Sequence, residues 1–180
     1  MFQKTALITL VITAFLSNSL FALDIEEVES MAKKILPAAS SIKEEKLNDR
    51  VYYVGCDKDK KKVGFIISSS SQGYESTINF MVGVDMECKV VSYLMSHKET
   101  PQYIEKVTKS KFKEQFKGLK KENCELKKND PVNGKLDAIA GATVSCNSII
   151  DGVKKSLEFA ETLLKAEKKE KMKNQPGKMP

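Results

Sequence analysis

The sequence predicts an α+β fold: an antiparallel β-meander flanked by helices, with a long C-terminal helix. Strand-like segments gather in the middle of the chain, segments with helical spacing lie at both ends, and the links between the strands are short. This grouping is typical of α+β proteins rather than of alternating βαβ units. Short links indicate antiparallel pairing, because a parallel pair needs a long crossover.

The central strands are bounded by turn signals. A charged turn at 57–62 (DKDKKK) and breaks at 71–74 and 85–88 separate runs of apolar and β-branched residues. The strands expected from these runs are 51–54, 63–70, 76–84 and 89–96, with a further strand at 122–126.

Shorter helices are expected on both sides of the sheet. Asp24 can cap a first helix over 24–36, which Pro37 ends. Its apolar residues share one face, so we expect it to dock on the body of the protein. Two short helices, 101–107 and 110–116, are expected after the sheet.

The longest helix is predicted from Cys146 to about Glu170, after a loop of small residues. Its apolar residues recur at helical spacing and are therefore assigned to the core. They are Ile149, Ile150, Val153, Leu157, Ala160 and Leu164.

Residues 1–22 have the pattern of an export signal. A short positive start is followed by an uncharged apolar run at 6–16 and by small residues up to Ala22. The run is short for a membrane span of about 20 residues, so a cleaved signal peptide is favoured over a retained membrane anchor. Both interpretations place the body outside the cytoplasm, in the periplasm or at the outer face of the inner membrane.

The positive charge is concentrated at one end of the chain. The formal net charge is +6, but the basic segment 165–180 holds six lysines against two glutamates, and the body, 23–164, is close to neutral. Arg50 is the only arginine, so the side chain best suited to bidentate phosphate and guanine contacts is almost missing. We therefore expect no nucleic-acid partner. The segment 165–180 is expected to be a solvated helix end that finishes in disorder.

Four cysteines leave two interpretations open. An even number in an exported chain favours two structural disulfides, with three possible pairings. Buried free thiols are the alternative. There is no CxxC pair and only one histidine, so neither a redox dithiol nor a metal centre is expected. The cysteines are Cys56, Cys88, Cys124 and Cys146.

The segment 137–145 (DAIAGATVS) is the most informative about chemistry. Gly141 and Ala142 are small enough to let a bulky group approach the backbone. Thr143 lies where a helix starts, so its hydroxyl would face unpaired N–H groups and the positive end of the helix dipole, which suits an anionic phosphate. The alternative is that Thr143 or Ser145 only caps the helix.

The stretch from Asp137 to Thr143, Asp-x-x-Ala-Gly-Ala-Thr, resembles the flavin-attachment motif of the FMN-binding domain family. That family includes the G subunit of Rnf-type electron transport complexes and the C subunit of the sodium-pumping NADH:quinone reductase. In the family FMN is joined through its phosphate to the threonine of the motif, which implies a phosphoester at Thr143 here. For Asp137 the resemblance implies a part in recognition by the modifying enzyme or in loop structure.

Two further blocks agree with the family in order and spacing. The stretch 83–101 ends in His97-Lys-Glu-Thr-Pro and resembles a strand–turn–strand unit with its Glu-Thr-Pro loop, and 106–116 resembles the short helices that follow. This makes Glu99 and Thr100 candidates for contacts with the flavin ring or ribityl chain. A solvated loop acid is the alternative for Glu99, and His97 is interpreted as a strand-end residue.

The chain departs from the family pattern at two places. Ala140 stands where the family usually has Ser or Thr, and Gln102-Tyr103-Ile104 stands where it usually has Gly-Leu-Gly. Loss of glycine changes which backbone conformations the loop can adopt. Tyr103 is instead able to pack against a flavin ring, as aromatic faces do.

The resemblance implies an FMN-binding domain over 23–164 and an extracytoplasmic electron-transfer flavoprotein, in which the flavin carries the chemistry. It also implies a flavin transferase that installs FMN from FAD, and membrane-bound or extracytoplasmic redox partners. No GxSxG, HExxH or P-loop motif is present, so a separate substrate site is not expected. The alternative is an exported, disulfide-stabilised binding module of the same fold, with non-covalent flavin or none.

Overall fold

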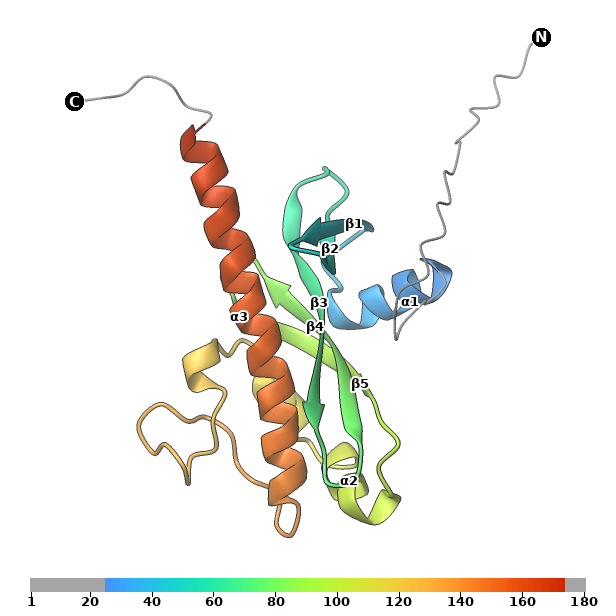
Figure 1. Ribbon diagram of the computed structural model, residues 1–180, viewed down its shortest axis with the longest axis vertical. Helices are drawn as coiled ribbons and strands as arrows, with labels where there is room; N and C mark the ends of the chain where they lie inside the picture. Colours follow the sequence, from blue (N-terminus) through green and yellow to red (C-terminus); the bar gives the residue numbers. More distant parts are fainter. Residues whose placement is uncertain (1–24, 174–180) are drawn as a thin grey trace.

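The computed structural model describes residues 25–173, so the predicted export signal, 1–22, lies outside the described residues. At its centre is an antiparallel sheet whose strand order in space follows the order in the chain (Figure 1). This confirms the predicted α+β class and the meander. The strands are β1 (Ser41–Leu47), β2 (Arg50–Cys56), β3 (Lys62–Gln72), β4 (Thr77–Asp85) and β5 (Val90–Ser96).

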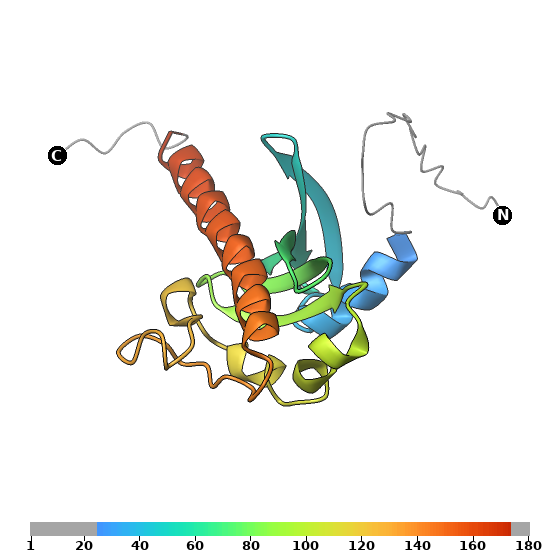
Figure 2. The same ribbon diagram turned by 60° about the horizontal axis from the view of Figure 1, so that its bottom comes forward.

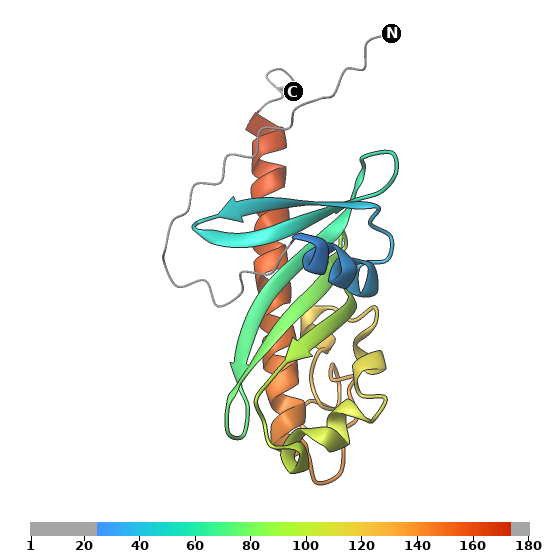
Figure 3. The same cartoon turned by 90° about the vertical axis from the view of Figure 1, so that its right-hand side faces the viewer.

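Two helices cover opposite faces of the sheet (Figure 3). The long helix α3 (Thr143–Lys173) packs on β3 and β4 from one side, and α1 (Ile25–Ile35) packs from the other. Successive residues of β3 alternate between the two layers: Phe65 and Ile67 belong to the cluster under α3, and Ile66 to the cluster under α1. Both faces of the central strands are therefore apolar, as side-chain alternation requires for a sheet covered on both sides.

The segment between β5 and α3 closes the end of the core (Figure 2). It contains the helix α2 (Pro101–Thr108), the 3₁₀ turns η1 (Lys113–Phe116) and η2 (Lys121–Asn123), and a loop that leads into α3. Phe112, Phe116 and Leu136 from this segment are fully buried. The segment therefore belongs to the same core as the sheet and α3.

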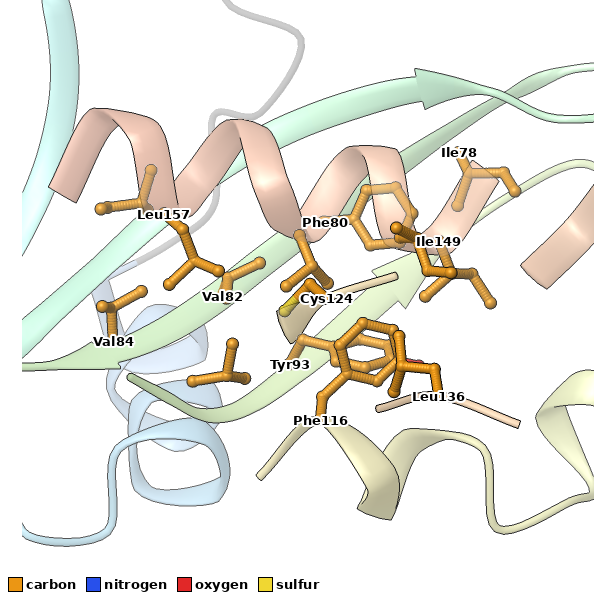
Figure 4. Packing of buried hydrophobic residues seen from close by; sticks show 14 of the residues in the cluster. Ile78, Phe80, Val82, Val84, Tyr93, Phe116, Cys124, Leu136, Ile149 and Leu157 are labelled. Carbon is orange, nitrogen blue, oxygen red and sulfur yellow. The ribbon is translucent and has the colours of Figure 1, made fainter. Parts of the chain in front are cut away.

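The contact between α3 and the sheet depends on one residue without a side chain. A Cβ added at Gly152 would lie 2.3 Å from the Phe80 ring, which occupies the centre of the packed cluster in Figure 4. Hydroxyls on β3 fix the helix along its length: Ser69 Oγ donates to the Gly152 carbonyl at 2.7 Å, and Ser71 Oγ donates to the Ser148 carbonyl at 2.6 Å. The helix is thereby held in one register against the sheet.

Some predicted elements are wrong. The strand expected at 122–126 is not formed: Lys121–Asn123 is the turn η2, and Leu126 makes only an isolated bridge to Leu136. Cys124 and Leu126 are both fully buried, which produced the alternation that suggested a strand. The helix expected at 110–116 is reduced to η1, and β1, which sequence analysis did not predict, pairs along its whole length with β2.

The two ends of α3 also differ from the prediction. The helix begins at Thr143 rather than Cys146, and it continues to Lys173. Residues 165–173 are helical, as expected for a solvated helix end, and the segment 174–180, where disorder was expected, lies outside the described residues. None of the helices in the described range 25–173 has both the length and the apolar character that crossing a membrane requires.

All four cysteines carry free thiols, so the disulfides that one interpretation favoured are not formed in the structure. Cys124 and Cys146 are fully buried, and Cys56 and Cys88 pack at the border of the core. Burial raises the pKa of the Cys124 thiol to about 12, and it also raises the pKa of Cys146. The buried cysteines therefore act as small apolar side chains.

Candidate functional site

The N-terminal end of α3 brings the predicted attachment residue to the surface of the protein. Gly141 has φ +71°, a conformation that favours glycine, and the turn closes with a 3.0 Å hydrogen bond from the Ala142 N–H to the Ile139 carbonyl. Ala142 is buried, whereas Thr143, the first residue of α3, is half-buried. The turn therefore anchors itself through Ala142 and presents Thr143 at the helix end, where N–H groups are unpaired.

Two lysines approach this turn from other parts of the chain. Lys128 Nζ donates to Thr143 Oγ1 at 3.4 Å, and Lys106 Nζ lies so close to Gly141 that an added Cβ would be 2.9 Å from it. Neither lysine makes an ion pair with a carboxylate in the part of the chain that the structure describes. Two uncompensated ammonium groups beside a helix N-terminus form an environment suited to an anion.

Asp137 lies at the start of the loop, and its carboxylate forms a 2.8 Å ion pair with Lys127. Its backbone is held by the side chain of Gln115, whose Oε1 accepts from the Asp137 N–H at 2.7 Å and whose Nε2 donates to the Asp137 carbonyl at 3.3 Å. The Asp137 side chain is exposed. The structure therefore gives Asp137 a place in loop structure, and recognition by a modifying enzyme stays a prediction.

Ser145 does not line the exposed side of the turn. Its side chain is buried, and its hydroxyl donates to the Tyr103 carbonyl at 2.5 Å. It fastens the first turn of α3 to α2. This contact gives the Ser145 hydroxyl a structural role, and a contact between Ser145 and the cofactor stays a prediction.

Glu99 is not the solvated loop acid that sequence analysis offered as an alternative, since only 6% of its surface is exposed. Its carboxylate accepts from the backbone N–H groups of the β3–β4 turn, the shortest being 2.6 Å from the Ser76 N–H, and from the Ser76 hydroxyl at 3.0 Å. Burial alone would raise the pKa of Glu99, but these bonds outweigh it and lower the pKa. A contact between Glu99 and flavin stays a prediction, because its described partners all belong to the turn.

Thr100 forms the second half of the same connection. Its backbone N–H and its hydroxyl both donate to the Glu75 carboxylate, the former at 3.0 Å. Glu99 therefore accepts hydrogen bonds from the turn 73–76, and Thr100 donates hydrogen bonds to Glu75 of the same turn. The Glu-Thr-Pro loop thus fixes the position of the β3–β4 turn.

His97 lies near a separate hollow between β5 and the end of α2. Its Nδ1 is buried and has no hydrogen-bond partner in the described structure. The cavity has a volume of about 260 Å³, and its lining is mostly apolar. The described residues contain no group of His, Cys, Asp and Glu side chains that could hold a metal ion.

The sequence analysis missed Lys106 and Lys128, which lie beside the turn before Thr143, and Tyr74, which packs on α2. Tyr74 stacks on Tyr103, with ring centroids 4.3 Å apart and ring planes 25° apart. No local signal marks these residues, because each comes from a different segment and reaches α3 only in the folded chain. A lysine with no carboxylate three or four residues away is a weak hint in the sequence, and Lys106 fits it, whereas Lys128 has Glu125 three residues before it.

Comparison with known proteins places the candidate site in a known domain. Residues 73–158 match the family described as FMN-binding domain. The chain is 28% identical over 118 residues to the G subunit of the proton-translocating ferredoxin:NAD(+) oxidoreductase complex of Clostridium ljungdahlii, which covers 65% of this chain and 64% of that protein. It is 26% identical over 147 residues to the G subunit of the ion-translocating oxidoreductase complex of Methanosarcina acetivorans, which covers 76% of this chain and 77% of that protein.

The match spans slightly less than two thirds of the clostridial protein. Among solved structures, the crystal structure of Shewanella oneidensis NqrC is similar, with a TM-score of 0.52 and 19% identity over 80% of this chain and 78% of that one. This likeness shows a shared fold. Thr143, Gly141, Glu99 and Tyr74 all fall inside residues 73–158, the part of the chain that is similar to the FMN-binding domain family.

Proposed function

We propose that this protein carries FMN, joined by a phosphoester to Thr143, and serves as an electron-transfer subunit of a membrane-bound, ion-translocating oxidoreductase complex. The family match supports FMN as the cofactor, and the relatives, both G subunits of such complexes, support the kind of complex. When bound, FMN supplies the electron-transfer chemistry. The chain has to hold it and shape its surroundings.

The observation that carries the proposal is the position of the Thr143 hydroxyl. It lies at the N-terminal end of α3, half-buried, with Lys128 Nζ at 3.4 Å. Lys106 lies on the other side of the turn, next to Gly141. A phosphodiester at this oxygen would meet two ammonium groups and the positive end of the helix, each of which stabilises a negative charge.

Attachment needs a partner, because no carboxylate or imidazole among the described residues is hydrogen-bonded to the Thr143 hydroxyl, whose side-chain contact is with Lys128. We infer a flavin transferase that uses FAD: Thr143 Oγ attacks the phosphorus on the flavin side, the bond to the bridging oxygen of the diphosphate breaks, and AMP leaves. The hydroxyl proton passes to a base of the transferase. The chain gains FMN less one water, and its lysines stabilise the charge of the new phosphodiester.

The location follows from the N-terminal pattern. We propose that residues 1–22 export the chain, which then works in the periplasm or at the outer face of the inner membrane. A covalent link prevents loss of the cofactor by diffusion in such a compartment. N-terminal sequencing of the mature protein tests this: a start at Leu20 or Leu23 indicates cleavage, and an intact Met1 indicates a retained segment.

Intact mass measurement tests the attachment. The protein is produced in the periplasm together with a flavin transferase, and a known substrate of that enzyme serves as the positive control. We expect the wild type to gain one FMN less water, Thr143→Ser to retain part of the gain, and Thr143→Ala to lose it. An unmodified, colourless wild type beside a modified control would refute the proposal.

Non-covalent flavin binding is the second candidate, and Ala140 favours it, because a hydroxyl that the family usually has beside the attachment point is missing. Its disulfide-stabilised form has no support, since the described cysteines are free. Acid precipitation separates the two candidates: covalent FMN stays with the precipitated protein, and non-covalent FMN is released.

A further inference from the structure

Large apolar side chains are exposed at only a few positions of the described structure, among them Tyr74, 58% exposed, and Val144, 51% exposed. Val144 is the residue next to Thr143 at the start of α3. Tyr74 stacks on Tyr103, whose carbonyl accepts a hydrogen bond from Ser145 in the first turn of α3. An exposed apolar side chain alone needs no explanation, but exposed apolar residues that gather at a functional helix end mark a surface for a partner.

Hydrogen bonds bring the segments of this surface together. Ser148 Oγ lies 2.7 Å from the Gln72 carbonyl and 3.0 Å from the Val144 carbonyl and shares its one proton between them, which ties the end of β3 to the first turn of α3. Ser145 Oγ donates to the Tyr103 carbonyl and ties α2 to the same turn. Tyr74, Tyr103 and Val144 therefore converge from the three segments around the N-terminal end of α3. We call these three residues the Tyr74 patch.

The aromatic part of the patch is stacked and leaves one ring exposed. The rings of Tyr74 and Tyr103 have centroids 4.3 Å apart and planes inclined by 25°. Tyr103 is half-buried beneath, whereas Tyr74 is mostly exposed. The pair thus offers a supported aromatic surface to solvent.

The turn that carries Tyr74 is held more firmly than an exposed turn requires. The buried Glu99 carboxylate accepts hydrogen bonds from the N–H groups of Tyr74, Glu75 and Ser76, at 3.1, 3.0 and 2.6 Å. Burying a carboxylate is unfavourable unless such bonds compensate it. Thr100 adds two bonds to Glu75 from the same loop. The chain therefore uses a buried charge to fix the position of an exposed tyrosine.

We propose that the Tyr74 patch binds the isoalloxazine ring of FMN, with the ring stacked on Tyr74. This inference rests on the proposed function, because the ring reaches the patch through a phosphate at Thr143. A planar aromatic ring gains most from an aromatic face that is already ordered, since little side-chain entropy is then lost. Glu99 is a positioning residue in this arrangement, and it acts on the ring through the turn.

Tyrosine in particular gives the stack a spectroscopic signature. A phenol in contact with a photoexcited flavin transfers one electron to it and receives the electron back, so that flavin fluorescence is quenched with no net reaction. Phenylalanine can stack but cannot donate that electron. Stacking and quenching are therefore separable by substitution at position 74.

The experiment compares loaded wild type with Tyr74→Leu, Tyr74→Phe and Tyr103→Leu, each confirmed by intact mass to carry one FMN. Val132→Ala is the matched control, because Val132 is an exposed apolar residue outside the patch. We expect wild-type fluorescence to lie at least about five-fold below that of free FMN. We expect Tyr74→Leu to recover most of it and to lose the induced visible circular dichroism. Tyr74→Phe should recover fluorescence yet keep the dichroism, and Val132→Ala should match the wild type.

Equal fluorescence and dichroism in loaded wild type and Tyr74→Leu would overturn the inference while leaving the proposed function intact. If the wild type gains no FMN, the proposed function fails, and titration of the unmodified protein with free FMN decides the patch. A saturable quench that Tyr74→Leu weakens at least about five-fold supports the patch. The same quench in both proteins, or none in either, refutes it.

Discussion

At the scale of single residues, Lys128 illustrates how a fold assembles a site from a side chain that looks ordinary in the sequence. It is one of 29 lysines in the chain. The neighbouring Lys127 forms an ion pair with Asp137. Lys128 instead reaches the Thr143 hydroxyl. Two adjacent lysines therefore have different partners, because the loop directs their side chains to different neighbours.

We predict that Lys128→Met slows flavin attachment to Thr143 by about 5- to 30-fold, because a charge-assisted contact contributes about 1–2 kcal/mol where negative charge develops. The measurement is the initial rate of mass gain with a limiting amount of transferase. Lys155→Met serves as the control, since Lys155 pairs with Asp151 on the exposed side of α3. Lys128→Arg should restore most of the rate, and a Lys128→Met protein modified at the wild-type rate would contradict the prediction.

Glu99 supplies a pH dependence whose sign can be worked out. Its pKa is lowered in the folded protein, because the hydrogen bonds of the turn outweigh burial. The carboxylate therefore contributes stability above its unfolded pKa of about 4.3, and this contribution is lost as the pH falls through the lower folded pKa.

We predict that Glu99→Gln lowers the free energy of unfolding at pH 7 by about 2 kcal/mol, since charge-assisted hydrogen bonds are lost in a buried site. Urea denaturation at several pH values measures it. The difference between wild type and variant should shrink below about pH 4.3. Glu87→Gln, at an exposed acid of the β4–β5 turn, is the comparison, and a pH-independent difference for Glu99→Gln would argue against the role assigned to its charge.

At the scale of elements, α3 packs closely on β4 because a glycine of the helix lies against a phenylalanine ring of the strand. Phe80 fills the space that Gly152 leaves, and the two serine hydroxyls of β3 set the register of the helix. A glycine inside a helix ordinarily costs about 1 kcal/mol relative to alanine. Here the close approach to the ring requires it.

We predict that Gly152→Ala destabilises the protein by about 1–3 kcal/mol despite the better helix propensity of alanine, because the added methyl overlaps a buried ring. Thermal and urea unfolding test this. Asn147→Ala, at an exposed position of the same helix, should be neutral or slightly stabilising. Stabilisation by Gly152→Ala would mean that the helix sits farther from the sheet.

At the scale of the whole molecule, stability comes from two apolar clusters, one on each face of the sheet, rather than from disulfide cross-links. The cluster under α3 includes residues from β2 to α3, with Cys124 and Cys146 among its apolar members. Their buried thiols have raised pKa values. Burial and low thiolate content both make a cysteine unreactive.

We therefore predict that two thiols of the native protein, Cys56 and Cys88, react with a thiol reagent, while the other two react only after unfolding. The melting temperature should be the same with and without reductant. Counting labelled cysteines by peptide mapping, before and after denaturation, checks both statements. A melting temperature that falls by more than about 5 °C in reductant would show that disulfides stabilise the protein.

The sequence by itself determined the class of fold and the attachment candidate. Alternation and turn signals identify β3, β4 and β5, and helical spacing identifies α3, because these properties depend on near neighbours in the chain. They do not identify β1, whose residues are mostly charged and gain their conformation from pairing with β2. They also misplace 122–126, where burial alternates without a strand partner.

Only the tertiary structure decided what surrounds Thr143. Lys106 and Lys128 approach its turn from two separate segments, and Glu99 proves to be a buried residue that fixes the β3–β4 turn rather than a solvated acid. Contacts of this kind depend on how loops close over a core, and no local pattern records that. The physical reason is range: periodicity acts over a few residues, whereas a site is made by residues that only folding brings together.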